Sequence, residues 1–279
     1  MAYAPTSFTS FLSLLTAAAL FCSGCAKRYR IQGLVLETDA AQSTVTISHK
    51  EIPGVMPAMA MPFRLTDPAV IPTLSPGMMV EFDLRGSSAR DIRPLPPSNQ
   101  IEEDGRKVTL ATPASQVKTG EVVPDFALTS HTGQRTRLSD FRDKVVAVNF
   151  LYTRCPLPEV CPRLAATFAR MQRRFADRND LALLTITLDP HHDTVEVLNR
   201  YSTLWKADSA RWRFLTGAPD DIRRAVEQFG IIYWPEEGIV THTSTIAIIG
   251  RSGRLHARID GLSFDAKQLG DLIESALSY

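Results

Sequence analysis

Two cysteines, Cys155 and Cys161, carry the clearest chemical signal in the sequence. They lie between an apolar run, 145–152, that predicts a buried strand, and a segment, 163–175, whose apolar residues recur at helical spacing. Pro162 stands where proline fits the first turn of a helix. Because a helix N-terminus carries a partial positive charge, it favours a thiolate, the nucleophilic and metal-binding form of cysteine. The pair is therefore a candidate redox couple or a candidate metal site.

A second candidate site lies in residues 48–63, a segment rich in histidine, methionine and proline. Met59 and Met61 are two positions apart, so in an extended strand their side chains face the same side. Together with His49 they would supply thioether and imidazole ligands, which favour Cu(I) over hard, oxygen-seeking cations. The alternative is that these methionines fill the interior of a barrel.

The first half of the chain predicts an all-β unit that would position this second site. Residues 30–37, 43–48 and 80–84 alternate apolar and polar side chains, as half-buried strands do. Several short strands in so short a stretch favour a small barrel, because closing a sheet removes its edges.

After residue 120 the pattern changes to strands that alternate with helices. Strands are predicted at 145–152, 181–188 and 212–215, and a hairpin and a closing helix, 265–277, follow them. This βαβαβ order with a final hairpin and helix is the thioredoxin-like arrangement. Two cysteines at the first strand-to-helix turn agree with it, although five residues separate them where thioredoxins have two.

Three further histidines have weaker claims to a functional role. His191 and His192 lie in the turn at the same sheet edge as the cysteines, and we expect them to be surface residues, with a secondary metal contact as the alternative. Asp193 is the candidate N-cap of a helix over 194–204. His131 lies in a polar turn.

The N-terminus reads as a targeting segment. An apolar run, 8–22, suits a signal-peptide core, and small residues follow it up to Cys25. This pattern resembles a bacterial lipoprotein signal, which implies that Cys25 becomes the lipid-modified first residue of the mature chain. The alternatives are a plain cleaved signal or an uncleaved anchor. Export would leave Cys155 and Cys161 as the remaining thiols in an oxidising compartment.

These patterns divide the chain into four parts. We expect a lipoprotein-type signal peptide at 1–25, a β-barrel at 28–95, a proline-rich linker at 96–119 and a thioredoxin-like domain at 120–279. The linker has an extra strand or two as its alternative. A net charge of +1 over 279 residues argues against nucleic acid as a partner.

The barrel segment resembles the CusF family of periplasmic copper-binding proteins, on His49 and the run Met56-Pro-Ala-Met59-Ala-Met61. The resemblance implies a small OB-like barrel that binds Cu(I) through His49, Met59 and Met61. Met56 stands where the family has a tryptophan over the metal. A further thioether would then replace the cation–π contact of that ring.

The second domain resembles the Sco/SenC family of thioredoxin-like copper chaperones, from about residue 123 to the C-terminus. The resemblance rests on Pro124-Asp-Phe126, Leu138-Ser-Asp140, Tyr152-Thr-Arg-Cys-Pro156, Val160-Cys-Pro162, Leu188-Asp-Pro190 and Val240-Thr-His242-Thr. It implies one copper ion held by Cys155, Cys161 and His242. Leu157 and Pro158 look like an insertion relative to the family's cysteine motif, and Thr241 stands where the family has aspartate.

Together the two resemblances imply an exported copper metallochaperone in the periplasm or cell envelope, held to a membrane by a lipid anchor. The barrel would capture Cu(I), and the second domain would deliver copper to the dinuclear copper centre of cytochrome c oxidase subunit II or a similar cuproprotein. Other periplasmic copper carriers are further expected partners. Two alternatives stay open: a thiol–disulfide oxidoreductase that uses Cys155 and Cys161 as a redox-active pair able to form a disulfide, and a copper-buffering or resistance lipoprotein.

Overall fold

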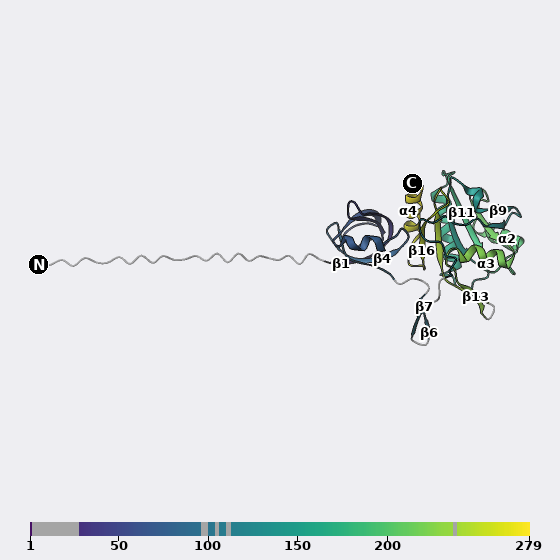
Figure 1. The fold of residues 1–279 in the computed structure, drawn as a ribbon, viewed down its shortest axis with the longest axis horizontal. Helices are drawn as coiled ribbons and strands as arrows, with labels where there is room; N and C mark the ends of the chain where they lie inside the picture. The colour runs from purple at the N-terminus through teal and green to yellow at the C-terminus, as the bar shows by residue number, and fades with distance from the viewer. Residues whose placement is uncertain (2–27, 96–99, 104–105, 110–112, 237–238) are drawn as a thin grey trace.

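The computed structural model describes residues 1, 28–95, 100–103, 106–109, 113–236 and 239–279. They form a barrel and an α/β unit that lie side by side, with α4 and β16 of the α/β unit nearest the barrel (Figure 1). The predicted signal peptide at 1–25, with Cys25, lies outside the described residues. Within the described part of the chain, no helix is long and apolar enough to cross a membrane.

Five antiparallel or parallel pairings close the barrel in the order β1-β2-β3-β5-β4. The strands are β1 (Tyr29–Asp39), β2 (Thr44–His49), β3 (Met59–Leu65), β4 (Met79–Arg85) and β5 (Ser88–Pro94), with a 3-10 helix at Pro68–Thr73. Alternate side chains of each strand point inwards, which explains the alternating sequence pattern. Val45, Ile47, Phe63 and Val80 are fully buried in its interior.

A seven-stranded sheet in the order β16-β15-β10-β11-β12-β8-β9 forms the centre of the α/β unit. Its central strands β10, β11 and β12 run parallel, and β10 and β11 are mostly apolar and buried along their whole length, as strands covered on both faces are. The strands are β8 (Ala127–Ser130), β9 (Arg135–Arg137), β10 (Val145–Leu151), β11 (Leu181–Thr187), β12 (Trp212–Thr216), β15 (Thr245–Ile249) and β16 (Leu255–Asp260).

Four α-helices accompany this sheet among the described residues: α1 (Cys161–Arg174), α2 (Val195–Leu204), α3 (Pro219–Glu227) and α4 (Ala266–Leu277). A 3-10 helix at Leu138–Phe141 precedes β10. Two short hairpins lie outside this sheet: β13 (Tyr233–Glu236) with β14 (Ile239–His242), and β6 (Gln100–Glu103) with β7 (Arg106–Thr109) in the predicted linker, where extra strands were the alternative. The predicted fold class, a small barrel followed by a thioredoxin-like α/β domain, is confirmed.

One prediction about a single residue was wrong. Thr194, and not Asp193, caps α2, because its hydroxyl accepts the backbone N–H of Val197. His131 lies in a turn, as predicted, and is only 3% exposed, since its ring packs edge-on against Phe214. A polar sequence around a residue does not exclude burial when a neighbouring strand covers it.

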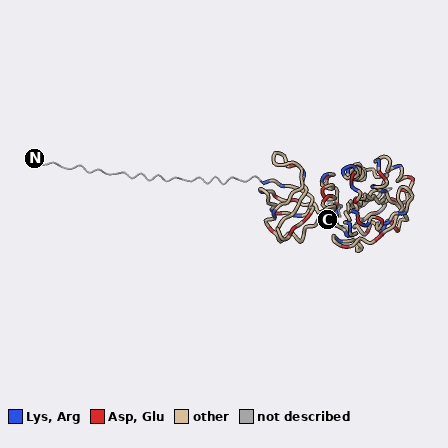
Figure 2. Tube along the Cα trace, turned by 90° about the horizontal axis from the view of Figure 1, so that it is seen from above, with Lys and Arg blue, Asp and Glu red and all other residues tan. Residues whose placement is uncertain are grey.

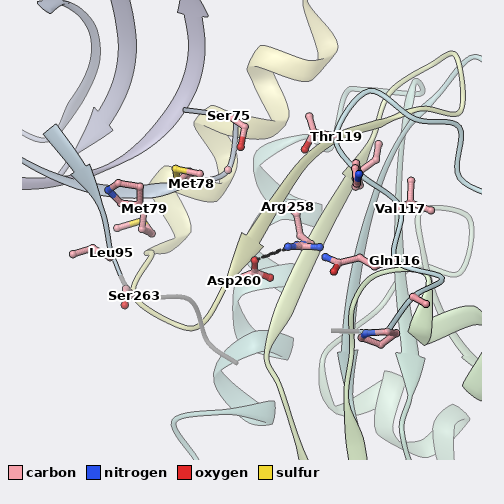
Figure 3. A pocket seen from close by; sticks show the side chains of 16 residues that line it. Ser75, Met78, Met79, Leu95, Gln116, Val117, Thr119, Arg258, Asp260 and Ser263 are labelled. Atoms are coloured by element: carbon pink, nitrogen blue, oxygen red, sulfur yellow. Dashed lines mark hydrogen bonds and ion pairs between the residues drawn. The ribbon is translucent and has the colours of Figure 1, made fainter. Parts of the chain in front are cut away.

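The barrel and the α/β unit share part of their core. Leu34, Leu36 and Met79 of the barrel belong to the apolar cluster of the α/β unit. A cavity of about 680 Å³ lies beside this contact. Figure 3 shows Met79 on its barrel side and the Arg258–Asp260 ion pair on the opposite side. Acidic and basic residues are interspersed along both units (Figure 2), in keeping with the net charge of +1.

Candidate metal centres

The cysteine turn joins the central strand β10 to α1. Cys161 is the first residue of α1 and is fully buried, while Cys155 is half-buried in the turn before it. Both are free thiols. The turn lies at the carboxyl end of a parallel strand, where α/β folds place their functional groups.

His242, at the end of β14, faces the buried thiol. Its Nε2 lies 3.9 Å from the Sγ of Cys161. Its Nδ1 lies 3.0 Å from the carbonyl oxygen of Thr243, and this contact requires Nδ1 to donate. In this tautomer Nε2 carries no proton, so its lone pair faces Cys161. Burial lowers the pKa of His242, which keeps its imidazole neutral and available as a ligand.

Cys161 is a thiol and not a thiolate in the metal-free site. Burial, with a smaller contribution from the Cys155 side chain, raises its pKa well above the usual range. The expectation that the helix N-terminus favours the thiolate is wrong at this residue, because desolvation outweighs the helix dipole. Burial also raises the pKa of Tyr152, whose ring packs edge-on against His242, to about 12. A soft metal would have to displace the Cys161 proton.

Cys155 lies in the turn before α1. Its Sγ lies 3.9 Å from the carbonyl oxygen of Leu157, in the inserted part of the turn. Among the described residues, no three His, Cys, Asp or Glu side chains converge closely enough to hold one metal ion. The structure brings Cys161 and His242 together, and the part of Cys155 in the predicted set stays a prediction. Leu157 itself is 55% exposed, so the insertion bulges into solvent.

Asp193 holds the cysteine turn in place, a role that the sequence reading missed. It is fully buried and accepts hydrogen bonds from the backbone N–H of Thr153 at 3.0 Å and from the Thr153 hydroxyl at 2.5 Å. Thr187 at the end of β11 donates to it at 2.5 Å, and Nδ1 of His192 lies 2.9 Å from it. One sequence signal could have indicated this role: Asp193 follows a predicted parallel strand and therefore lies at the same sheet edge as the cysteines.

The predicted barrel ligands lie on one inner face. His49 of β2 pairs directly with Met59 of β3, and Ile47 pairs with Met61. Directly opposed residues of an antiparallel pair share a face, so these side chains line the barrel interior near one end. Met59 is 38% exposed, which shows that this end opens to solvent.

His49 carries an unpaired nitrogen in this interior. The residue is fully buried, and its Nδ1 donates to the carbonyl oxygen of Lys50 at 2.7 Å. Its Nε2 has no hydrogen-bond partner in the described structure. A buried polar atom without a partner costs about 1–3 kcal/mol, which a bound metal ion would offset. Gly33 of β1 pairs with His49 and allows β1 and β2 to approach closely: a Cβ there would lie 2.3 Å from Cγ2 of Ile47.

Met56 lies outside the paired strands. It forms an isolated bridge with Ile52 in the turn before β3, with backbone hydrogen bonds of 2.9 and 3.1 Å. Its half-buried side chain packs against the barrel core. Met56 is not part of the β2–β3 pairing that aligns His49 with Met59. The role of Met56 as a copper ligand therefore stays a prediction.

The α/β unit places a buried thiol beside a neutral imidazole, and it follows a barrel that contains a His/Met cluster. This combination is typical of a thioredoxin-like protein that binds a soft metal. Comparison with known proteins agrees. The family model described as SCO1/SenC matches residues 114–278. The chain belongs to the SCO1/SenC family. The family model described as "Copper binding periplasmic protein CusF" matches residues 28–92. Both predicted resemblances are confirmed, and copper is confirmed as the metal of these families.

Curated relatives match the α/β unit. Human "Protein SCO1 homolog, mitochondrial" is 29% identical over 137 residues, covering 46% of this chain and 44% of that protein. Mouse "Protein SCO2 homolog, mitochondrial" is 28% identical over 158 residues, covering 53% and 60%. A "putative copper-binding protein" of Stutzerimonas stutzeri is 27% identical over 147 residues, covering 49% and 68%. The chain spans about half the length of the first curated relatives it matches.

Solved structures share the fold. A copper-bound ScoI of Arabidopsis thaliana has a TM-score of 0.50 at 21% identity, covering 57% of this chain and 100% of that one. A SCO1/SenC family lipoprotein of Bacillus anthracis has a TM-score of 0.51 at 24% identity, covering 58% and 98%. At this level of identity the likeness establishes the thioredoxin-like architecture.

Proposed function

We propose that this protein is an exported copper metallochaperone that takes up Cu(I) in its barrel and delivers copper from its SCO1/SenC unit. The observation that carries the proposal is the 3.9 Å approach of the neutral His242 Nε2 to the Cys161 Sγ, with the free thiol of Cys155 beside them. Two thiolates and one imidazole form a soft, three-coordinate set suited to copper.

Copper binding at this site is an exchange of protons for metal. Each thiol that becomes a ligand loses its proton, which passes to solvent or buffer. His242 already presents its lone pair and has no proton to lose at Nε2. A three-ligand set leaves an open coordination position, so a partner protein can take the metal by ligand exchange. Cys155, the more exposed of the two thiols, is the ligand that a partner would reach first.

The barrel adds a second, thioether-based site. The unpaired Nε2 of His49 and the inward-facing Met59 and Met61 carry no net charge and suit Cu(I). Joining two copper modules in one chain raises the effective concentration of donor and acceptor, which favours transfer between them.

The proposal also includes a recipient for the copper and a cellular compartment. We place the protein in the periplasm or cell envelope, anchored through Cys25, with the dinuclear copper centre of cytochrome c oxidase subunit II as recipient. Similarity to a Bacillus anthracis lipoprotein and to BsSco, described as a member of a family of cytochrome c oxidase assembly proteins, supports this reading. Mass spectrometry of the membrane fraction tests the anchor: Cys25→Ser should abolish acylation and release the protein.

Titration of the reduced protein with Cu(I) tests the metal sites. We expect two independent sites, one lost in Cys155→Ala or His242→Ala, the other in His49→Ala or Met59→Ala. His191→Ala, an exposed histidine on the same sheet edge as the cysteines, is the matched control and should bind like the parent. If the cysteine and His242 variants bind two copper ions as the parent does, the proposal fails for the SCO1/SenC unit.

A thiol–disulfide oxidoreductase remains the second candidate, because both thiols are free and one is accessible. Burial raises the pKa of Cys161 and makes it a poor attacking thiol, so Cys155, the more exposed of the two, would have to attack the partner's disulfide. Reduction of a disulfide on a peptide carrying the recipient's cysteines would distinguish the two. Stoichiometric reduction without copper would favour the oxidoreductase over the chaperone.

A further inference from the structure

Helix α4 of the SCO1/SenC unit contacts the barrel next to its copper-site histidine. Ser48 is fully buried although its side chain faces out of the barrel. Its hydroxyl donates to Oδ2 of Asp271 at 2.6 Å, and its carbonyl oxygen accepts from Nε2 of Gln268 at 2.9 Å. Lys50 reaches the carbonyl oxygen of Ser263 at 3.5 Å. The residues on both sides of His49 are therefore held by the other unit.

Gln268 joins the start of α4 to the barrel. It is 1% exposed, and its Oε1 accepts the backbone N–H of Asp265 at 3.0 Å. The carboxylate of Asp265 accepts the backbone N–H of Gln268 at 2.9 Å, so the pair forms a capping box. With its oxygen engaged there, the amide has its Nε2 directed at Ser48. The cap of α4 therefore also serves as the barrel contact.

Asp271 links the same contact to the helix of the metal-binding cysteine. Its Oδ1 accepts from Arg174 in the last turn of α1 at 3.0 Å. At the other end of α1, Arg163 donates to the carbonyl oxygen of Phe264 at 2.6 Å. Helix α1, which begins at Cys161, is thus tied at both ends to α4 and its leading residues.

The contact matters for His49 because the ring depends on the backbone around it. Nδ1 of His49 donates to the carbonyl oxygen of Lys50. The position of Lys50 depends on the end of β2, which is held by α4 at Ser48 and by the contact of Lys50 itself with Ser263. Elsewhere the two units share apolar contacts through Leu34, Leu36 and Met79. A cavity of about 680 Å³, lined by Met78 of the barrel and by Arg258 and Asp260, lies beside them (Figure 3). The polar contacts beside the barrel site are therefore those that α4 makes with Ser48.

We propose that α4 is a positioning element for the barrel's copper site, with Gln268 and Asp271 holding Ser48 so that the unpaired Nε2 of His49 faces Met59. The inference rests on the proposed Cu(I) site in the barrel and deepens it. The barrel binds Cu(I) more tightly when docked than when separated from α4. Because coupling between sites is reciprocal, Cu(I) in the barrel also stabilises docking. Separation of the units then releases copper.

The test uses the full chain with Cys155 and Cys161 replaced by serine, so that the barrel holds the remaining copper site. Cu(I) affinity is measured by competition with bicinchoninate in Ser48→Ala and Gln268→Glu. The glutamate keeps an oxygen for the Asp265 N–H but has no donor for Ser48 when ionised. We expect each change to weaken barrel binding about tenfold, as the loss of a buried hydrogen bond does. Lys267→Gln is the matched control, because Lys267 binds the same Oδ2 of Asp271 without touching the barrel.

A second readout separates positioning from general destabilisation. Long-range ¹H–¹⁵N spectra report which nitrogen of His49 carries the proton. The parent and Lys267→Gln should show the Nδ1–H form, and Ser48→Ala and Gln268→Glu a mixture of both forms. Unchanged affinity and an unchanged tautomer in both variants would overturn the inference. If the parent without Cys155 and Cys161 binds no Cu(I), no barrel site exists, and if His49→Ala binds like that parent, His49 is not a ligand; either result overturns the proposed barrel site together with the inference.

Discussion

The Nε2 of His242 and the Sγ of Cys161 lie 3.9 Å apart although 81 positions separate the two residues in sequence. The approach arises because β14 ends beside the turn between β10 and α1. Cys161 is fully buried and His242 is partly buried, and desolvation acts on them in opposite directions: it lowers the pKa of the imidazole and raises that of the thiol. Each residue is thereby kept in its neutral form until a metal replaces the thiol proton.

Copper affinity at the cysteine site should rise with pH. The pKa of Cys161 lies above its ordinary value, so the thiol stays protonated at neutral pH and each bound thiolate releases one proton. We expect the apparent Cu(I) affinity to increase by up to about tenfold per pH unit for each proton released between pH 6 and 8. The barrel set contains an imidazole and thioethers but no thiol, so Cu(I) affinity there should depend less on pH and serves as the comparison. A flat pH profile at the cysteine site would exclude thiolate ligation.

Asp193→Asn should loosen the cysteine turn. The buried carboxylate accepts hydrogen bonds from Thr153 and Thr187, and an amide can satisfy only part of these donors. We expect a loss of about 2–3 kcal/mol in the free energy of unfolding, measured in urea, and weaker Cu(I) binding at the cysteine site alone. His192→Ala removes one exposed partner of Asp193 and should cost less than 1 kcal/mol. Equal effects of the two changes would contradict the positioning role of Asp193.

Lowering the pH should destabilise the fold through His131. Burial lowers its pKa, and its Nδ1 accepts the backbone N–H of Phe214 at 3.1 Å, which requires the unprotonated nitrogen. The unfolded chain binds this proton more readily, so the contribution to stability is present above about pH 6.5 and is lost as the pH falls below it. His131→Asn should reduce the slope of unfolding free energy between pH 7 and pH 5, while His191→Asn should leave it unchanged. Parallel slopes in the parent and His131→Asn would show that His131 is not responsible.

Gly33→Ala should damage the barrel site. The added Cβ would lie 2.3 Å from Cγ2 of Ile47 and 3.5 Å from Cβ of His49, so β1 and β2 must move apart. We expect a loss of about 1–3 kcal/mol in barrel stability, from overpacking, together with weaker Cu(I) binding there. At Gly250 an added Cβ meets nothing closer than 3.8 Å, so Gly250→Ala is the matched control. Thermal unfolding and Cu(I) titration of both variants check the prediction, and an unaffected barrel in Gly33→Ala would contradict it.

The sequence by itself determined the elements and the two clusters of soft ligands. Alternation predicted the barrel strands, and apolar runs predicted β10 and β11, because burial on one or both faces leaves a local pattern. The spacing of Met59 and Met61 placed them on one face for the same reason, and their register with Ile47 and His49 agrees. The cysteine turn was visible because strand and helix signals flank it directly.

Only the tertiary structure decided which distant groups meet. It set Asp193 beneath the cysteine turn instead of at the N-cap of α2, buried His131 against Phe214, and turned Cys155 towards Leu157. It also brought Ser48 against Gln268, 220 positions away. Sequence patterns record whether a residue is buried by its own element, whereas these contacts depend on strand order and on how the two units pack. No local pattern carries that information, because each contact joins elements whose pairing is settled by the whole fold.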